Sequence, residues 1–569
     1  MAKIGPRTAR NAVAAAVFAA VAVATGLLES CASRPATAVR ASAAPAAASA
    51  AVPPPTAASP PTAAVTLPGA ASPATVPSAG TLPSAGSVPS AGASPPKASP
   101  PPVAAARGVG TTLATAPTAP DTIKPVAAPQ AGYVETALSE YLLEKLPNGV
   151  TLAVKRQPDR GMAVARILLA SDGSVRDESE AGYAALALDL AASGATGTTE
   201  GSVEATVSEA GGSISLSLED YDDVSMELVC PSDKLSGLLG LVARSLASPS
   251  FAETDFDPTL RQARIAERRE AGDPLARAET EIRSDLFKGH AYGLPPGGTL
   301  GSLATATPER IARFWSDSFG ADRLSVVAVA DIEPARLASS LASSFGSIPG
   351  GGSSLGRTAQ KPPPLPLHPW FKAVALSAIP GSVLLRGEFG APEESSADYP
   401  ALAVALLMLD DLVLENLRAG RVSASGAWTD LSAAAAPAAS ISVYRTEEPA
   451  AAKAAIDAAI SELAAGRCLG ATVAQSLDSY KSRAIVALYS GGASPEGMAA
   501  LIARDLAAGG DGTAVFRAAG RIRGVSADDV VRVARERLLD GPSAWIAVGD
   551  PALVRGLRDG DFVRVADRP

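Results

Sequence analysis

The segment Gly173–Gly194, GSVRDESEAGYAALALDLAASG, holds the pattern that decides the fold. Its acidic loop, Asp177 to Glu180, precedes a run of good helix formers from Tyr183 to Ala192. Gly194 is the expected end of this helix, because glycine readily adopts the left-handed conformation found just beyond helix C-termini. The segment is therefore predicted to be an acidic loop followed by an apolar helix.

This loop and helix resemble the signature segment of the insulinase-type zinc peptidases, the pitrilysin or M16 family. In that family the helix carries an inverted zinc motif, His-x-x-Glu-His. An ungapped alignment places Ala185 and Asp189 at the two histidine positions and Leu188 at the glutamate position. The third zinc ligand of the family, a glutamate, falls at Ala266, with Glu267 beside it. The resemblance therefore implies a member whose motif is degenerate.

The missing residues remove the chemistry of the motif. A catalytic zinc takes three protein ligands and a water, and the motif glutamate acts as general base toward that water. Ala185 has no donor atom, Leu188 accepts no proton, and only Asp189 could bind a cation. A one-residue shift of the alignment would restore one carboxylate at Glu267 but no histidine. We interpret Asp189 and Glu267 as solvated helix residues rather than as a hard-cation site.

Further segments follow the order of the family through most of residues 138 to 350. Leu146 to Val154, LPNGVTLAV, matches its opening hairpin and is a turn by its own Asn-Gly chemistry. Glu209 to Ile214 resembles its Gly-Gly turn into a strand, and Ser215 stands near a substrate-contacting asparagine of the family. Phe319 to Asp331 resembles the strand that closes its first domain.

The second half resembles the family more faintly. A strand at Ser382 to Gly390 and a capped, apolar helix ending at Leu417 are predicted from their own patterns. The segment after that helix resembles the family segment whose arginine and tyrosine hold substrate. Arg421 keeps the arginine, whereas Ser425 replaces the tyrosine. The chain then closes with a helix and strand that repeat the closing pattern of the first half, which indicates an internal duplication.

The N-terminus indicates export. Residues 1–31 combine a positive start with an apolar run, and Leu28-Glu29-Ser30-Cys31 resembles a bacterial lipoprotein cleavage site with Cys31 as the lipidated residue. An uncleaved membrane anchor and an ordinary signal peptide remain alternatives. In the first two cases the body is held at a membrane of the cell envelope, on the periplasmic side or at the cell surface.

Composition divides the rest of the chain. Residues 32–130 are rich in Pro, Ala and Ser with hardly any charge, which predicts a disordered tether that forms no core. The remaining body suits two domains, and the Gly- and Pro-rich stretch 351–369 is the expected linker between 131–350 and 370–569.

The residue inventory excludes several classes of function. The chain has two histidines, His290 and His368, which rules out a histidine-rich zinc site and gives no support to a serine hydrolase. Cys230 and Cys468 are expected to be buried thiols, although a disulfide between them is conceivable in an exported protein. A net charge of −9 argues against nucleic acid as a partner.

Together these observations predict an α+β fold with two tandem M16-like domains, each an antiparallel-rich sheet with helices on one face. The first hypothesis is a catalytically inactive pseudo-peptidase without a cofactor, which binds unfolded peptides or pairs with an active M16 subunit. The second is an active zinc metalloendopeptidase with an atypical site, which would need zinc. The third is a structural envelope lipoprotein.

Overall fold

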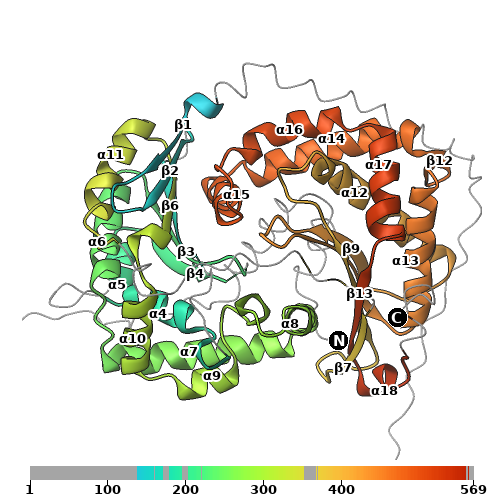
Figure 1. The fold of residues 1–569 in the computed structure, drawn as a ribbon, viewed down its shortest axis with the longest axis horizontal. Coiled ribbons are helices and arrows are strands. Elements are labelled where there is room, and N and C mark those ends of the chain that lie inside the picture. The colour runs from blue at the N-terminus through green and yellow to red at the C-terminus, as the bar shows by residue number, and fades with distance from the viewer. Residues whose placement is uncertain are drawn as a thin grey trace, which may run out of the picture. The chain divides into compact units, whose positions relative to one another are not determined.

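The computed structural model describes residues 137–158, 161–170, 178–194, 203–218, 221–350, 365, 367, 370–558 and 562. The leader, the tether and nearly all of the linker predicted from the sequence lie outside these residues. The described chain forms two α+β halves, each built on one main sheet (Figure 1). The predicted fold class, α+β with antiparallel-rich sheets, is confirmed.

The elements of the first half alternate between the strands of its sheet and the helices that cover it. In chain order they are β1 (Tyr141–Lys145), β2 (Thr151–Arg156), β3 (Met162–Ala170), a 3-10 turn (Glu178–Glu180), α4 (Tyr183–Ala191), α5 (Val203–Glu209), β4 (Ser213–Ser217), β5 (Asp223–Pro231), α6 (Leu235–Ala247), α7 (Glu253–Gly272), α8 (Pro274–Leu286), a 3-10 turn (Ala291–Gly293), α9 (Leu300–Thr305), α10 (Pro308–Ser318), a 3-10 turn (Ala321–Arg323), β6 (Leu324–Ala330) and α11 (Pro334–Phe345).

The second half repeats this alternation with longer helices. Its elements are β7 (Trp370–Ala375), β8 (Val383–Gly390), α12 (Asp398–Ala419), β9 (Gly426–Leu431), β10 (Ala438–Thr446), α13 (Pro449–Ala464), the short hairpin β11 (Arg467–Cys468) and β12 (Ala471–Thr472), α14 (Val473–Gly491), α15 (Pro495–Ala507), α16 (Ala514–Gly524), α17 (Ala527–Val533), a π-helical turn (Ala534–Leu539), β13 (Ser543–Gly549) and α18 (Pro551–Val554).

The predicted Asn-Gly hairpin connects β1 and β2, which pair antiparallel. Gly149 has φ 103°, and a Cβ there would lie 2.7 Å from the Cα of Asp322, so the turn needs glycine. The side-chain amide of Asn148 donates to the carbonyl oxygens of Phe345 at 2.8 Å and of Ile348 at 3.0 Å. The turn thereby fixes the C-terminal end of α11 against the start of the sheet.

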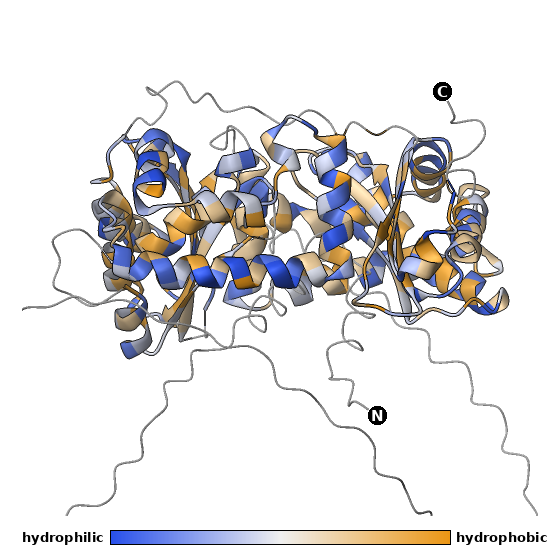
Figure 2. Ribbon diagram, turned by 90° about the horizontal axis from the view of Figure 1, so that it is seen from below, coloured by the Kyte–Doolittle hydropathy of each residue, from blue (hydrophilic) through white to orange (hydrophobic). Residues whose placement is uncertain are grey.

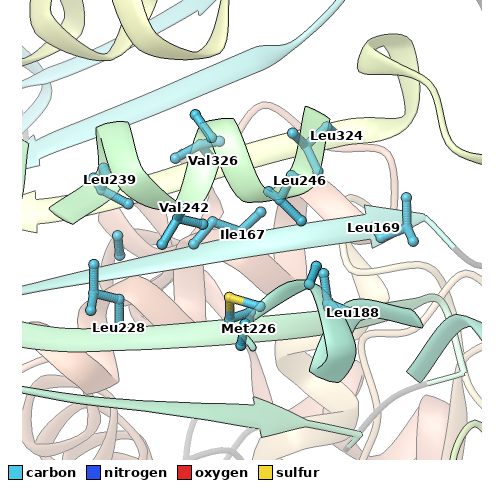
Figure 3. Packing of buried hydrophobic residues seen from close by; sticks show 14 of the residues in the cluster. Ile167, Leu169, Leu188, Met226, Leu228, Leu239, Val242, Leu246, Leu324 and Val326 are labelled. Carbon is cyan, nitrogen blue, oxygen red and sulfur yellow. The ribbon is translucent and has the colours of Figure 1, made fainter. Parts of the chain in front are cut away.

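One face of the first sheet packs on helices of its own half. Along β3 the residues alternate, and Ile167 and Leu169 point to the same side as Met226 of β5 and Val326 of β6. Leu239, Val242 and Leu246 of α6 and Leu188 of α4 cover this side (Figure 3). Burial of this interdigitated apolar layer provides the main stabilisation of the first half.

The opposite face of the first sheet is covered by the second half. Val164 and Leu168 of β3 and Val327 of β6 form a second cluster with Ile502 of α15 and Phe516 of α16. Figure 1 shows α15 on this side of the sheet, with α6 and α11 on the other. The sequence predicted helices on one face of each sheet. This prediction holds only for the helices that belong to the same half as the sheet.

One face of the second sheet is likewise covered by a helix of the first half. Ala544, Ile546 and Val548 of β13 pack against Ala278 and Ile282 of α8, which belongs to the first half. Its other face packs on the long α12, which the sequence predicted and which ends at Ala419. One helix of each half thus packs on the sheet of the other half, so that the two halves interlock.

The strand orders confirm the predicted duplication. The first sheet runs β1-β2-β6-β3-β5-β4 and the second runs β7-β13-β8-β10-β9, so the second repeats the first without β1. In both sheets one neighbouring pair is parallel, β2 with β6 and β7 with β13. Arg166 pairs with Val327, four residues before Asp331, and Arg386 pairs with Ile546, four residues before Asp550. The two arginines therefore occupy equivalent positions.

The interlock predicts that α15 is essential to stability. Ile502 is fully buried between α15 and the first sheet, so Ile502→Ala should lower the free energy of unfolding by about 2–5 kcal/mol. Ile265 of α7 is 50% exposed, so Ile265→Ala, the matched control, should change it by less than about 0.5 kcal/mol. Urea unfolding measures both, and equal effects of the two substitutions would contradict the interlocked packing.

Candidate functional site

The helix at the position of the family motif, α4, starts at a glycine that the packing requires. Gly182 has φ 80°, and a Cβ there would lie 2.6 Å from the Cα of Gly298. Leu186 N–H donates to the Gly182 carbonyl oxygen at 2.9 Å, which begins the helix. The loop around Gly298 is thereby held directly against the N-terminus of α4.

The motif positions on α4 face the hydrophobic core. Ala185 and Leu188 belong to the core cluster of the first half, and Leu188 has no exposed surface. Figure 3 shows the Leu188 side chain among the same apolar residues as Met226. Asp189 is half-buried and is the one residue of α4 outside the fully buried class. The position that the sequence alignment assigns to the general base is therefore occupied by a core side chain.

The segment aligned with the third zinc ligand lies on α7, which packs against α4. Ala266 is exposed and Glu267 is half-buried, with no hydrogen-bond partner for its Oε2 atom. One turn further on, burial raises the pKa of the Glu270 carboxyl, and Glu267, Glu279 and Asp273 raise it further. Figure 2, seen from below, shows the hydrophilic residues along this long helix. Glu267 is therefore half-buried, with one carboxylate oxygen out of contact with water, whereas the sequence predicted it to be solvated.

The donor set does not fit a zinc ion. Among the described residues, no group of three or more His, Cys, Asp or Glu side chains could hold a metal. His290 has a structural contact, because its Nδ1 accepts a hydrogen bond from Tyr292 N–H at 3.0 Å. His368 lies outside the described residues, as does Cys31, the predicted lipidation site. Metal-dependent hydrolysis consequently has no ligand set in the described part of the chain.

Ser215 lies on an edge strand beside the helix α4. It belongs to β4, the last strand of the first sheet, which pairs with β5 on one side only. Its register partner is Glu227, whose carboxylate forms a buried ion pair with Arg166 at 2.8 Å. Ser213, Ser215 and Ser217 share one face of β4 by strand alternation. β4 is thus the edge strand of the described sheet, and its serine face runs from the exposed Ser213 to the buried Ser217.

Arg421 lies in the second half, at the C-terminus of α12. Val422 N–H donates to the Leu417 carbonyl oxygen and Arg421 N–H to that of Arg418, which is the hydrogen-bond pattern of a Schellman motif. Arg421 therefore holds the left-handed position, with φ 55°, that usually belongs to glycine. Its side chain is exposed, and Ser425 N–H donates to the Tyr444 carbonyl oxygen at 2.8 Å.

Both main sheets also contain buried charged residues within their strands, which were not predicted from the sequence. Arg166 and Glu227 pair across the first sheet, and Arg386 pairs with Glu388 in the second, with all four side chains at most 10% exposed. The sequence pattern that indicates such a buried charge is a charged residue in the middle of an apolar strand, as in MAVARILLA and VLLRGEFG. Such a residue in a sheet buried on both faces must find a partner.

The cysteines agree with the preferred prediction. Cys230 and Cys468 are both buried free thiols. Burial, with the nearby Asp233 carboxylate, raises the pKa of the Cys230 thiol to about 11, so the reactive thiolate is not populated at neutral pH.

None of the helices that the structure describes is long and apolar enough to cross a membrane.

Comparison with known proteins places this fold among M16 peptidase structures. The chain is similar to a protease from Helicobacter pylori, with 18% identity, a TM-score of 0.62 and coverage of 72% of this chain and 99% of that one. It is similar to a peptidase M16 inactive domain from Pseudomonas fluorescens, with 16% identity, a TM-score of 0.59 and coverage of 72% and 98%.

A third similarity is to the first half of the periplasmic protease PqqL from Escherichia coli, with 12% identity, a TM-score of 0.58 and coverage of 75% and 95%. No protein-family model and no curated protein matches the sequence. The likeness shows an M16-like fold. It leaves the catalytic competence of this chain to be judged from its own residues.

The packing of α4 predicts that Leu188 is a structural residue. Leu188→Ala should lower the free energy of unfolding by about 2–5 kcal/mol, because it leaves a cavity in the core. Leu300→Ala is the matched control, since Leu300 is 43% exposed and should tolerate the change. Thermal or urea unfolding distinguishes the two, and a negligible effect of Leu188→Ala would show that the position is not part of the core.

The donor set also predicts the metal content. The purified protein should contain far less than one zinc per chain by elemental analysis, and it should leave an unstructured peptide intact with or without added zinc. Stoichiometric zinc together with chelator-sensitive cleavage would contradict this prediction and would favour the active metalloendopeptidase.

Proposed function

We propose that this protein is an exported, lipid-anchored pseudo-peptidase that binds unfolded peptides and acts as the non-catalytic partner of a proteolytic complex. The observation that carries the proposal is the contrast between α4 and β4. The positions of α4 that align with the motif are filled by core residues such as Leu188, whereas β4 beside it is an edge strand that, among the described residues, pairs only with β5. Catalysis has been lost from this place while a surface suited to an extended chain remains.

Peptide capture would occur by strand addition. An exposed sheet edge binds an extended peptide through backbone hydrogen bonds, and neighbouring side chains select its residues. Edge strands that have no such role usually carry bulges, prolines or charged side chains that block pairing. The sequence of β4, SISLS, has none of these features. The small hydroxyl side chains of Ser213, which is exposed, and Ser215, which is half-buried, would leave room for varied peptide side chains, whereas Ser217 is buried.

Arg421 supplies a second argument for peptide binding. A non-glycine residue in the left-handed region costs about 1 kcal/mol relative to glycine, so the choice of arginine opposes local stability. Its guanidinium has no ion-pair partner among the described residues. An exposed cation held in an unfavourable backbone conformation is consistent with selection for a ligand, and a peptide carboxylate or backbone carbonyl is the fitting group.

The proposed location and partner rest on the N-terminal segment and on the fold. The lipoprotein-like segment ending at Cys31 would anchor the body to a membrane of the cell envelope, and residues 32–130 would give it reach. A neighbouring structure is described as half of a periplasmic protease, which agrees with an exported setting. A chain of this size corresponds to one half of that protein, so an active M16 subunit is the partner that would complete a comparable assembly.

The direct test is binding of a fluorescent, unstructured peptide to the purified protein, followed by anisotropy. A copy of the peptide with N-methyl groups on alternate residues along one edge should lose most of its affinity, because it cannot pair with β4. A copy methylated on the opposite edge is the control and should still bind. Equal affinity of the three peptides would exclude strand addition, and no binding by any peptide would favour the structural envelope lipoprotein.

Arg421 gives the complementary prediction. Arg421→Gly should raise the free energy of unfolding by about 1 kcal/mol, because glycine suits the left-handed position, and it should weaken peptide binding several-fold. Arg418→Gly is the control, since it removes a nearby exposed arginine from the helix. It should lower the free energy of unfolding by an amount similar to the rise expected for Arg421→Gly. Unchanged peptide affinity in Arg421→Gly would remove Arg421 from the binding site.

A further inference from the structure

The outward side of α7 carries a stripe of exposed residues that is rich in arginine. The residues of this stripe, here called the α7 arginine stripe, are Pro258, Arg261, Gln262, Ile265, Arg268 and Arg269, all of them exposed. They recur at intervals of three or four positions, so they lie on one side of the helix over about 17 Å. Figure 2 shows α7 lengthwise on the side of the first half that faces the viewer. The stripe therefore forms one continuous basic surface.

The acidic residues in this part of α7 lie off the stripe. Glu267 is half-buried, and its Oε2 atom is shielded from water. Glu270 is directed to the loop at Gly297, where a Cβ atom would lie 3.9 Å from the Glu270 Oε2 atom. Arg261 and Arg268 have no ion-pair partner among the described residues. The positive charge of these two arginines is thus not neutralised by the described part of the chain.

A large apolar side chain lies between these arginines. Ile265 is 50% exposed and stands four residues after Arg261 and three before Arg268. The neighbouring helix α9, which packs on α7, exposes a second large apolar side chain, Leu300. Figure 1 shows α7 and α9 together along the lower edge of the first half. This part of the molecule therefore presents basic and apolar groups together.

The second half provides an internal comparison, because α14 precedes α15 in the same way as α7 precedes α8. Counting back from the prolines that begin α8 and α15 aligns Ile265 with Val486, and both residues are 50% exposed. The same count places Ser482 and Tyr489 at the positions of the two arginines. An exposed apolar residue is therefore common to both helices, whereas the arginines are not required by the fold of a half.

We propose that the α7 arginine stripe docks the protein on a membrane surface that contains anionic phospholipids. The guanidinium groups of Arg261 and Arg268 pair with lipid phosphates, which their planar fork fits through two parallel hydrogen bonds. Ile265, between them, enters the apolar layer beneath the headgroups. In this arrangement α7 lies parallel to the membrane plane, as interfacial helices do.

The distribution of charge favours a lipid surface as the occupant. The chain as a whole carries a net charge of −9, so an anionic surface repels most of the molecule and attracts it only at a basic face. A nucleic acid would need a more extensive basic surface, and it would leave Ile265 without an apolar environment. The inference rests on the proposed lipid-anchored setting, in which the predicted tether, residues 32–130, brings the body to the membrane. The stripe then fixes which side of the body faces the lipid.

Fluorescence from a dye at a single introduced cysteine tests the contact. Full-length protein with Cys31→Ser carries an environment-sensitive dye at Ile265→Cys or, as the matched control, at Val486→Cys; Cys230 and Cys468 are buried and leave the dye one site. Vesicles of phosphatidylcholine and phosphatidylglycerol should shift the emission of the dye at position 265 to the blue, because the dye enters an apolar layer. The dye at position 486 should keep its emission, as should both dyes with phosphatidylcholine alone.

Charge variants of the labelled protein test the arginines. Arg261→Gln combined with Arg268→Gln should raise the vesicle concentration for a half-maximal shift about thirtyfold, because each arginine near an anionic surface contributes about fivefold in affinity. Arg467→Gln combined with Arg517→Gln is the control, since both residues are exposed in the second half and their loss changes the net charge equally. This control should leave the half-maximal concentration unchanged. High salt should abolish the shift, because it screens the arginines.

The proposal is overturned if the dye at position 265 keeps its emission with every vesicle, or if the dyes at positions 265 and 486 respond equally. An equal effect of the two pairs of arginine substitutions would also overturn it, because net charge alone would then explain the binding. A shift with soluble polyglutamate but not with vesicles would assign the stripe to an acidic protein instead. Failure of the proposed function is seen separately, as absence of peptide binding in the anisotropy experiment.

Discussion

The exchange of α8 and α15 between the two sheets is the constraint on which the structure depends. A sheet with apolar residues on both faces needs cover on both, and the helices of each half cover one face only. The second face of each sheet is closed by a helix that belongs to the other half. Neither core is complete in an isolated half, so the two sequence repeats behave as one folding unit despite their separate strand networks.

The same requirement for a complete core accounts for the apolar residue at position 188. Leu188 fills space against β5, and a glutamate there would bring a charge into an apolar layer without a cation to neutralise it. In an active site the metal would neutralise that charge, so the ligands and the general base depend on one another. Once the histidines are absent, an apolar residue at position 188 is more stable than a carboxylate. The side chains of α4 are therefore suited to packing in the core.

The sequence predicted those features that depend on local chemistry. Asn148-Gly149 identified the first hairpin, the apolar run identified α4, and the capped apolar run identified α12. It could not predict the exchange of helices, because α8 and β13 are separated by more than 250 residues and an amphipathic pattern does not name its partner. The burial of Arg283 on α8 could not be predicted for the same reason. Arg166 and Arg386 could have been recognised as buried, since each interrupts an apolar strand.

The two halves share a scaffold and differ in chemistry, and the difference is located in the exchanged helices. Counted from the prolines that begin α8 and α15, Arg283 and Arg504 occupy the same position, and both have Nε and Nη1 buried without a partner. Arg504 now pairs with Glu394 at 3.7 Å within its own half, whereas Arg283 stacks on rings and faces the strand charges of the other half. The ion pair of Arg504 lies within one half and does not depend on the contact between the halves. The rings around Arg283 also belong to its own half, so each exchanged helix brings an arginine held by its own half to the sheet of the other half.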